Sequence, residues 1–186
     1  MVFIHDTEQS LRAAAALVNT LPHVGTEAVD QLETQADFDA YLDEYAYTGT
    51  FYRDDAELEA VRANRGRLRG LWDVDRDAAV PIVNAMLRDG SALPQLVIHD
   101  GFDWHIHATE SDAPLSVRML VEAAMAFVDV IRADQWGRVR ICEADDCDAV
   151  YVDFSKNGSK RYCDTGNCGN RMNVIAYRRR KAEESA

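Results

Sequence analysis

Four cysteines are the residues of this sequence whose type and spacing most clearly indicate a chemical role. Cys142 and Cys147 are separated by four residues, fifteen residues follow, and Cys163 and Cys168 are again separated by four. Two short pairs joined by a loop allow two tight turns to meet at one ion, and zinc prefers a tetrahedron of thiolate or imidazole ligands. Four sulfur ligands leave no open coordination position. The spacing therefore predicts one structural Zn²⁺ held by these four cysteines.

Disulfide bonds and an iron centre are the alternatives for these cysteines. The N-terminal residues "MVFIHDTEQS" lack the basic start and apolar stretch of a signal peptide. No run approaches the roughly 18 apolar residues of a membrane span. We therefore expect a cytoplasmic protein without a membrane partner, in which thiols stay reduced and zinc is favoured over disulfides. Metal binding also supplies folding energy to about fifty residues that are too few for a robust core of their own.

The basic residues are concentrated at the same end of the chain as the cysteines. The net charge of the whole sequence is −12, and residues 1–137 hold 10 arginines, no lysine and 24 acidic residues. Residues 155–181, in contrast, hold eight basic residues and one acidic residue. Phosphate binding needs local positive potential, so the body is unsuited to nucleic acid and the basic end is suited to it.

The residues that follow Cys168 read as a helix that starts beside the metal. At about 100° per residue, Arg171, Arg178 and Lys181 share one sector of this helix, and a mostly apolar stripe occupies another. One face can therefore pack, and another can meet phosphate. The residues expected to contact nucleic acid are Lys160, Arg161, Arg171, Arg178, Arg179, Arg180 and Lys181.

Two structural explanations compete with nucleic-acid binding for these basic residues. A centre of one zinc and four thiolates carries a net charge of about −2, which nearby cations neutralise. Cations also suit the C-terminal end of a helix, where the dipole is negative. The run from Arg178 to Lys181 exceeds both needs and favours a polyanion surface. Arg171 lies next to the cysteines, and it suits hydrogen bonding to backbone carbonyls there as well as it suits DNA.

The elements before the cysteines predict a mostly helical region with a small sheet. Thr34 followed by Asp37 indicates a variant capping box at the start of one helix. The alternation about Asp100-Gly101 predicts a β-hairpin with a two-residue turn, in which Val97 lies opposite Trp104. The helical segments cover residues 8–20, 34–47, 55–71, 76–87 and 114–131.

A second hairpin is predicted between the two cysteine pairs. Its first strand covers 150–154, Asn157-Gly158 can form the turn, and Tyr162 closes the return strand. The full prediction is an α+β fold. A mostly helical N-terminal domain with a β-hairpin or small sheet covers residues 1–135. A small four-cysteine zinc-finger domain covers residues 136–186. Its predicted order is a first knuckle, the turn with Cys142 and Cys147, then a hairpin, a second knuckle, the turn with Cys163 and Cys168, and a helix.

The remaining polar residues give little indication of catalysis. His105 and His107 share one side of the first predicted hairpin without a third ligand, which argues against a second metal site. No cysteine remains outside the four, and no serine lies in a recognisable nucleophile turn. We therefore expect a protein that is not an enzyme.

The tetrapeptide Cys168-Gly169-Asn170-Arg171, with the earlier cysteines, "RYC" before it and "VIAYRRR" after it, resembles the CGNR zinc-finger family of bacterial proteins. The preceding residues are similar to the ABATE domain of that family, with "LVNT" at 17–20, an aromatic and leucine helix at 38–42, and a hairpin before the last long helix.

This resemblance implies a stress-induced transcription regulator. Its finger would bind double-stranded DNA and hold zinc through the four cysteines. By analogy with the family, the N-terminal domain would bind a small-molecule effector. Because a single helix of this size buries little DNA-facing area, we also expect this domain to serve dimerisation, giving a homodimer. The alternative is a zinc-stabilised protein-interaction or RNA-binding module without DNA specificity.

Overall fold

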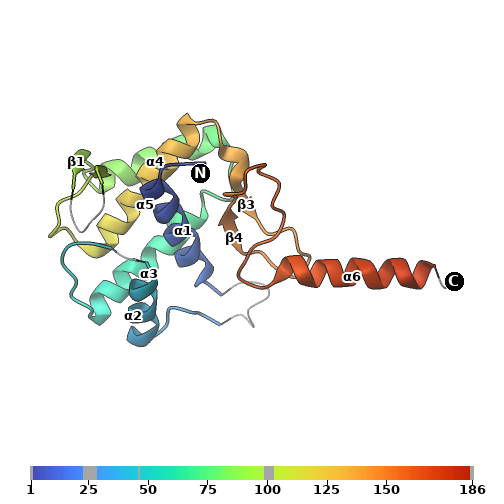
Figure 1. Ribbon diagram of the computed structural model, residues 1–186. Helices are drawn as coiled ribbons and strands as arrows, with labels where there is room; N and C mark the ends of the chain where they lie inside the picture. Colours follow the sequence, from blue (N-terminus) through green and yellow to red (C-terminus); the bar gives the residue numbers. More distant parts are fainter. Residues whose placement is uncertain (1, 23–28, 46, 99–102, 185–186) are drawn as a thin grey trace.

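The chain is described here by a computed structural model that covers residues 2–22, 29–45, 47–98 and 103–184 (Figure 1). Within these residues it forms six α-helices and two small antiparallel sheets, which confirms the predicted α+β class. The helices are α1 (His5–Asn19), α2 (Gln35–Glu44), α3 (Asp55–Arg69), α4 (Arg76–Asp89), α5 (Leu115–Arg132) and α6 (Cys168–Glu183). The strands are β1 (Gln95–Val97), β2 (His105–His107), β3 (Val139–Ile141) and β4 (Val150–Val152), and a short 3-10 turn, η1 (Trp136–Arg138), precedes β3.

Three of the helices begin at capping side chains. The predicted capping box is present, because Thr34 Oγ1 accepts a hydrogen bond from the Asp37 N–H at 3.2 Å and the Asp37 carboxylate accepts one from the Thr34 N–H at 2.8 Å. Asp54 and Asp75 cap α3 and α4 through a single side-chain hydrogen bond each, accepted from the Glu57 N–H at 2.8 Å and from the Ala78 N–H at 2.9 Å. Each such cap stabilises its helix by about 1 kcal/mol.

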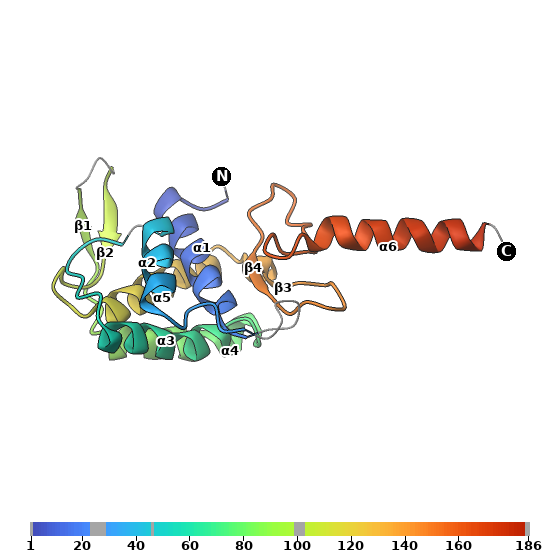
Figure 2. The ribbon, with the colours of Figure 1, turned by 90° about the horizontal axis from the view of Figure 1, so that it is seen from below.

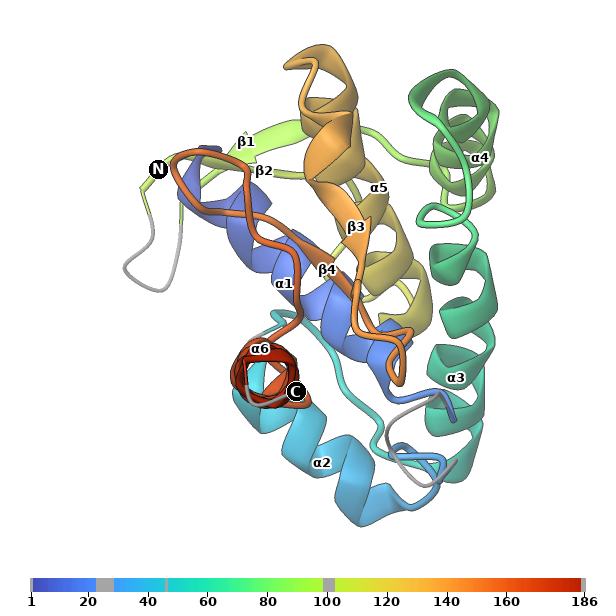
Figure 3. The same cartoon turned by 90° about the vertical axis from the view of Figure 1, so that its right-hand side faces the viewer.

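The apolar core is built around α5. This helix buries ten of its residues, and α1, α3 and α4 pack against it. Figure 3 shows α3 and α4 running along one side of α5. Phe127 of α5 is fully buried and meets Trp72 edge to face, with ring centroids 5.3 Å apart. In the described ranges, no helix is long and apolar enough to cross a membrane.

The β1–β2 hairpin is confirmed, but its predicted register is wrong. Val97 pairs with His105 rather than with Trp104, and the predicted turn at Asp100-Gly101 lies outside the described residues. The shift of one residue puts the half-buried Val97 on the same side as the two half-buried histidines. As expected, His105 and His107 share a side, and their Nε2 atoms are 3.1 Å apart.

The second hairpin differs from the prediction in its partner strand. β4 forms within the predicted 150–154 segment, but it pairs with β3, which precedes the first cysteine pair. The loop that holds Cys142 and Cys147 therefore connects the two strands. The order is strand, knuckle, strand, loop, knuckle and helix, so the predicted placement of the hairpin between the knuckles is wrong.

Side chains explain why the predicted return strand does not form. The carboxylate of the buried Asp153 accepts a hydrogen bond from the Lys160 N–H at 2.8 Å. Arg140 of β3 donates to the carbonyls of Gly158 and Lys160, each at 2.9 Å. These side chains satisfy backbone groups that a return strand would use, so the segment folds as a compact loop.

The β3–β4 sheet is fixed to the helical body. The Asn19 side chain both donates to the Val150 carbonyl, at 2.9 Å, and accepts from the Val150 N–H, at 2.8 Å. Trp72 Nε1 donates to the Tyr151 carbonyl at 3.0 Å. Val150 and Val152 are buried in the same apolar cluster as the helices. The core of the body therefore continues past residue 135 into this sheet.

Helix α6 begins beside the cysteines, as predicted, and then projects away from the rest of the molecule (Figure 2). Met172 packs against the cysteine cluster, but every described residue from Asn173 to Glu184 is exposed. Ile175, which belongs to the stripe suited to packing, is 50% exposed. The apolar stripe of α6 therefore does not pack on the body beyond its first turn.

Candidate zinc centre and nucleic-acid interface

The four cysteines converge on one point. Their sulfur atoms all lie within 4.8 Å of one another, and Sγ of Cys163 is 3.7 Å from Sγ of both Cys147 and Cys168. A tetrahedral zinc with Zn–S bonds of about 2.3 Å requires sulfur atoms about 3.8 Å apart. The side chains therefore fit the ion, and Cys142, Cys147, Cys163 and Cys168 form a zinc-binding site.

The first knuckle is shaped by backbone hydrogen bonds at the end of β3. The Cys142 N–H donates to the Ala149 carbonyl at 2.8 Å, which closes the loop between the strands. The Cys147 N–H donates to the Ala144 carbonyl at 3.0 Å, which makes the tight turn before the second ligand. The loop thus presents two thiols from one strand connection.

The second knuckle leads directly into α6. Cys168 is the first residue of the helix, and Asn167 before it adopts the left-handed conformation, with φ of 51°. A Cβ atom on Gly166 would lie 3.1 Å from the Cys168 sulfur, so glycine permits the close approach of this turn to the thiol. The Cys163 N–H also donates to the Cys142 sulfur at 3.4 Å, which links the two knuckles.

Electrostatics favour a cation at this point. Burial, with the neighbouring Cys163, raises the pKa of Cys147 to about 11, and the same two causes raise the pKa of Cys168. Thiolates at Cys147 and Cys168 are therefore unfavourable unless a positive ion compensates them. When bound, zinc supplies four bonds between the knuckles and keeps no open position, so its role is structural.

Arg171 links the first turn of α6 to the first knuckle. Its Nη2 atom donates to the Asp146 carboxylate at 2.7 Å and lies 3.3 Å from the Cys168 sulfur. Its Nε atom is buried without a hydrogen-bond partner in the described part of the chain. The sequence suggested two roles for Arg171, hydrogen bonding beside the cysteines or contact with DNA. The structure shows hydrogen bonding beside the cysteines, although a carboxylate and a thiol replace the expected carbonyls.

Lys160 and Arg161 lie in the loop before the second knuckle, and both have acidic neighbours. Lys160 pairs with Asp164, and Arg161 Nε lies 2.6 Å from the Glu143 carboxylate. The Glu143 hydrogen bond raises the pKa of Arg161. Lys160 and Arg161 can therefore contact phosphate only if they release their acidic partners or share them with the phosphate.

The four remaining predicted contacts lie on the projecting part of α6. Arg178, Arg179, Arg180 and Lys181 are all exposed, and Arg179 pairs with Glu183 on the next turn at 3.2 Å. Four consecutive helical residues are spaced at about 100°, so their cations surround the helix rather than marking one side. The structure thus separates the seven predicted residues into three near the knuckles and four on the outer turns.

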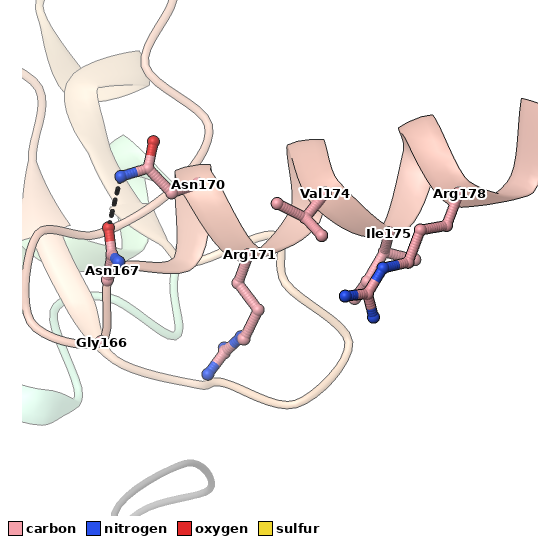
Figure 4. Close-up of a pocket in the computed structure, with 7 residues that line it drawn as sticks. All are labelled: Gly166, Asn167, Asn170, Arg171, Val174, Ile175 and Arg178. Carbon is pink, nitrogen blue, oxygen red and sulfur yellow. Dashed lines mark hydrogen bonds between the residues drawn. The ribbon is translucent and has the colours of Figure 1, made fainter.

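One side of α6 borders a hollow of about 370 Å³ next to the second knuckle. Arg171 and Arg178 point to this side, as their predicted common sector requires, and Val174 and Ile175 lie near them (Figure 4). Asn170 instead donates to the Asn167 side chain at 2.8 Å. This side of the helix combines cations with exposed apolar groups.

Three polar contacts that shape the finger were missed in the sequence. They are the pairing of Asp146 with Arg171, the loop contacts of Arg140, and the contact of Asn19 with β4. An acid between two zinc ligands and an arginine after the last one are signals from which the first contact could have been found. Asn19 belongs to the "LVNT" segment, and it hydrogen-bonds the finger sheet to the body.

Comparison with family models gives two matches along the chain. Residues 11–134 match the ABATE model, described as "Putative stress-induced transcription regulator", and residues 138–181 match the CGNR zinc finger model. The two matches have the order expected from the sequence. A comparison with curated proteins gives no match.

Proposed function

The chain belongs to the ABATE family and carries a CGNR zinc finger, and from this premise we propose that it regulates transcription by binding double-stranded DNA through α6. The zinc centre is the anchor that fixes the first turn of this helix. The basic outer turns contact phosphate. The acidic body serves regulation, and the protein acts in the cytoplasm.

The projection of α6 is the observation that carries this proposal. All described residues from Asn173 to Glu184 are exposed, so more than two turns of the helix are available to a ligand on every side. A helix with its side chains is about 10–12 Å across, close to the width of the major groove of B-DNA, about 12 Å. The shape therefore suits insertion into that groove.

The charges along α6 support the same partner. Arg178 to Lys181 are four adjacent cations on exposed turns, and Arg178 and Lys181, three positions apart, repel each other on this helix. Phosphates on both sides of a groove relieve this repulsion. A short helix that is marginal alone in water thus gains stability when a polyanion binds.

The position of the acidic body is compatible with DNA at this end. α6 extends away from the helical body in both side views (Figures 1 and 2). Residues 1–137 carry 24 acidic side chains against 10 arginines. Distance between these acids and the duplex limits their repulsion, which falls off over a Debye length of about 8 Å at physiological salt.

The test is binding of the zinc-loaded full chain to duplex DNA at several salt concentrations, followed by fluorescence anisotropy. Replacing Arg178, Arg179, Arg180 and Lys181 together by Ala should abolish most binding and reduce the slope of log K against log salt by about 3–4. The matched control removes four exposed arginines of the body, Arg53, Arg67, Arg76 and Arg88, and should leave the slope unchanged.

A protein-interaction or RNA-binding module is the second candidate, and one observation favours it. Val174, Ile175 and Tyr177 on α6 are 47%, 50% and 57% exposed, which is unusual for a helix that only meets phosphate. If the zinc-loaded chain does not bind duplex DNA at low salt, the DNA proposal is wrong. Binding to single-stranded or duplex RNA under those conditions would then support the second candidate.

A cleft in the described part of the chain is a candidate location for the expected small-molecule effector. A cleft of about 610 Å³ lies between the β1–β2 hairpin and the 48–49 and 108–113 segments, with His107, Glu110 and Ser111 among its polar side chains. Regulation by an effector at this cleft is compatible with the proposed function. Thermal shift with small polar metabolites, followed by the same DNA titration, tests it.

A further inference from the structure

The β1–β2 hairpin carries an exposed apolar face that DNA binding by α6 does not use. Leu96 pairs with Ile106 across the ladder, and they are 66% and 44% exposed. Ile98 and Trp104 flank this pair and are 56% and 64% exposed. Side chains alternate along a strand, so Leu96 and Ile106 point away from the half-buried histidine side.

The hairpin also stands apart from the helices. Figure 2 shows it at the end of the molecule opposite to α6. Two-stranded hairpins are at best marginally stable in water when they stand alone. Large apolar side chains exposed together on such an element therefore indicate a surface that another protein covers.

The area of this face is sufficient for a modest interface. The four apolar side chains present on the order of 400 Å². Two such faces bury on the order of 800 Å² together, and surrounding backbone and polar atoms bring the total to roughly 1,000 Å². That total lies at the lower end of specific protein interfaces.

We propose that this face binds the same face of a second copy of the chain. None of the four side chains is charged, and the neighbouring Asp103 is acidic and exposed, so nucleic acid and anionic lipid are unsuitable partners. An uncharged apolar ladder is complementary to itself about a twofold axis. The second copy is also present wherever the first one is.

The geometry of this dimer leaves both zinc fingers accessible. Because the hairpin and α6 lie at opposite ends of the molecule, pairing through hairpins covers neither α6. Each dimer then offers two projecting helices to its partners. The inference concerns the hairpin alone and holds whether or not α6 binds DNA.

The test is sedimentation equilibrium of the zinc-loaded full chain at about 1–100 µM. We expect a monomer–dimer equilibrium with a dissociation constant in this range. The double variant Leu96→Glu, Ile106→Glu should remain monomeric at the highest concentration, since like charges then face each other across the interface. Unchanged circular dichroism and zinc content confirm that this variant is folded.

The matched control is Ile4→Glu, which adds a charge at an apolar residue that is 62% exposed and lies before α1. It should dimerise like the parent chain. If the double variant does not fold, the milder Trp104→Ser should weaken dimerisation at least tenfold. The proposal is overturned if the parent chain is monomeric at 100 µM, if the folded hairpin variants dimerise like the parent, or if Ile4→Glu disrupts the dimer equally.

Discussion

The helical body and helix α6 differ in how much of their surface they bury. In the body, Leu11, Phe38, Val61 and Phe127 are completely buried and belong to one apolar cluster. In the described part of α6, Cys168 is the one buried residue. The difference teaches that two kinds of interaction stabilise this chain: apolar burial holds the body, and metal coordination with polar contacts holds the knuckles and α6.

The change from one kind of stabilisation to the other lies inside the finger. The β3–β4 sheet shares the core of the body through Val150 and Val152, whereas Cys142, Ala149 and Tyr151 belong to a separate cluster around the cysteines. β4 thus has one side in each cluster. Loss of zinc should affect the two cysteine pairs and α6 and leave the body intact.

Removal of zinc should produce the largest effect. Structural zinc contributes roughly 10–16 kcal/mol in zinc-finger peptides, so the variant Cys168→Ser should unfold both knuckles and release α6. The body should remain folded, because its core contains no zinc ligand. Two-dimensional amide NMR of the variant should show random-coil shifts for 142–149 and 160–184 and native shifts for α1, α3 and α5. Unfolding of the whole chain would contradict the comparison, and so would an unchanged spectrum.

The variant Phe127→Ala should have the next largest effect, and on the other region. It removes a fully buried ring that packs on Trp72, so the free energy of unfolding of the body should fall by about 3–5 kcal/mol. Chemical denaturation monitored by tryptophan emission measures it. The control Ile175→Ala, on exposed α6, should change this free energy by less than about 0.5 kcal/mol. Equal effects of the two variants would show that the regions are not stabilised differently.

Acid should destabilise the body through Asp30. The hydrogen bond from Arg65, aided by Leu32 N–H and by Arg62, lowers the pKa of Asp30 from 3.8 to about 2, against the cost of burial. Because the pKa is lower in the folded state, the contribution is fully present above about pH 4 and is lost as the pH falls toward 2. It amounts to about 2 kcal/mol.

Urea unfolding at pH 6, 4 and 2, followed by the emission of the buried Trp72, measures this loss. Asp30→Asn should already be less stable at pH 6, because Arg65 loses its charged partner, and it should lose about 2 kcal/mol less than the parent between pH 4 and 2. The same acid dependence in both proteins would assign the loss to other carboxylates.

Local rules explain which elements could be predicted from the sequence. The helix cap at Thr34 and the zinc ligands follow from residues only a few positions apart, and these predictions are confirmed. The strand pairing of the finger could not be predicted, because β3 and β4 have three residues each and their choice of partner depends on contacts with Asn19 and Trp72. The predicted register of β1 and β2 was wrong because it was derived from the turn residues Asp100-Gly101 and not from contacts of the strands themselves. The partner of Arg171 depends on how the two knuckles fold together, which spacing alone does not give.

The variant Arg171→Ala should have the smallest effect, and it tests where the knuckles end and the exposed helix begins. Arg171 contacts Asp146 and the Cys168 sulfur, and a donor near a ligating thiolate stabilises its charged form. Zinc affinity, measured by competition with a chromogenic chelator, should fall about tenfold. Asp146→Asn should weaken zinc binding by a smaller factor, and the double variant should show less than the sum of the two effects in free energy, because the residues act as a pair.

The matched control Arg178→Ala, two turns further along the same side, should leave zinc affinity unchanged. If Arg171→Ala keeps full zinc affinity and lowers DNA affinity as Arg178→Ala does, Arg171 belongs functionally to the projecting helix and not to the zinc centre.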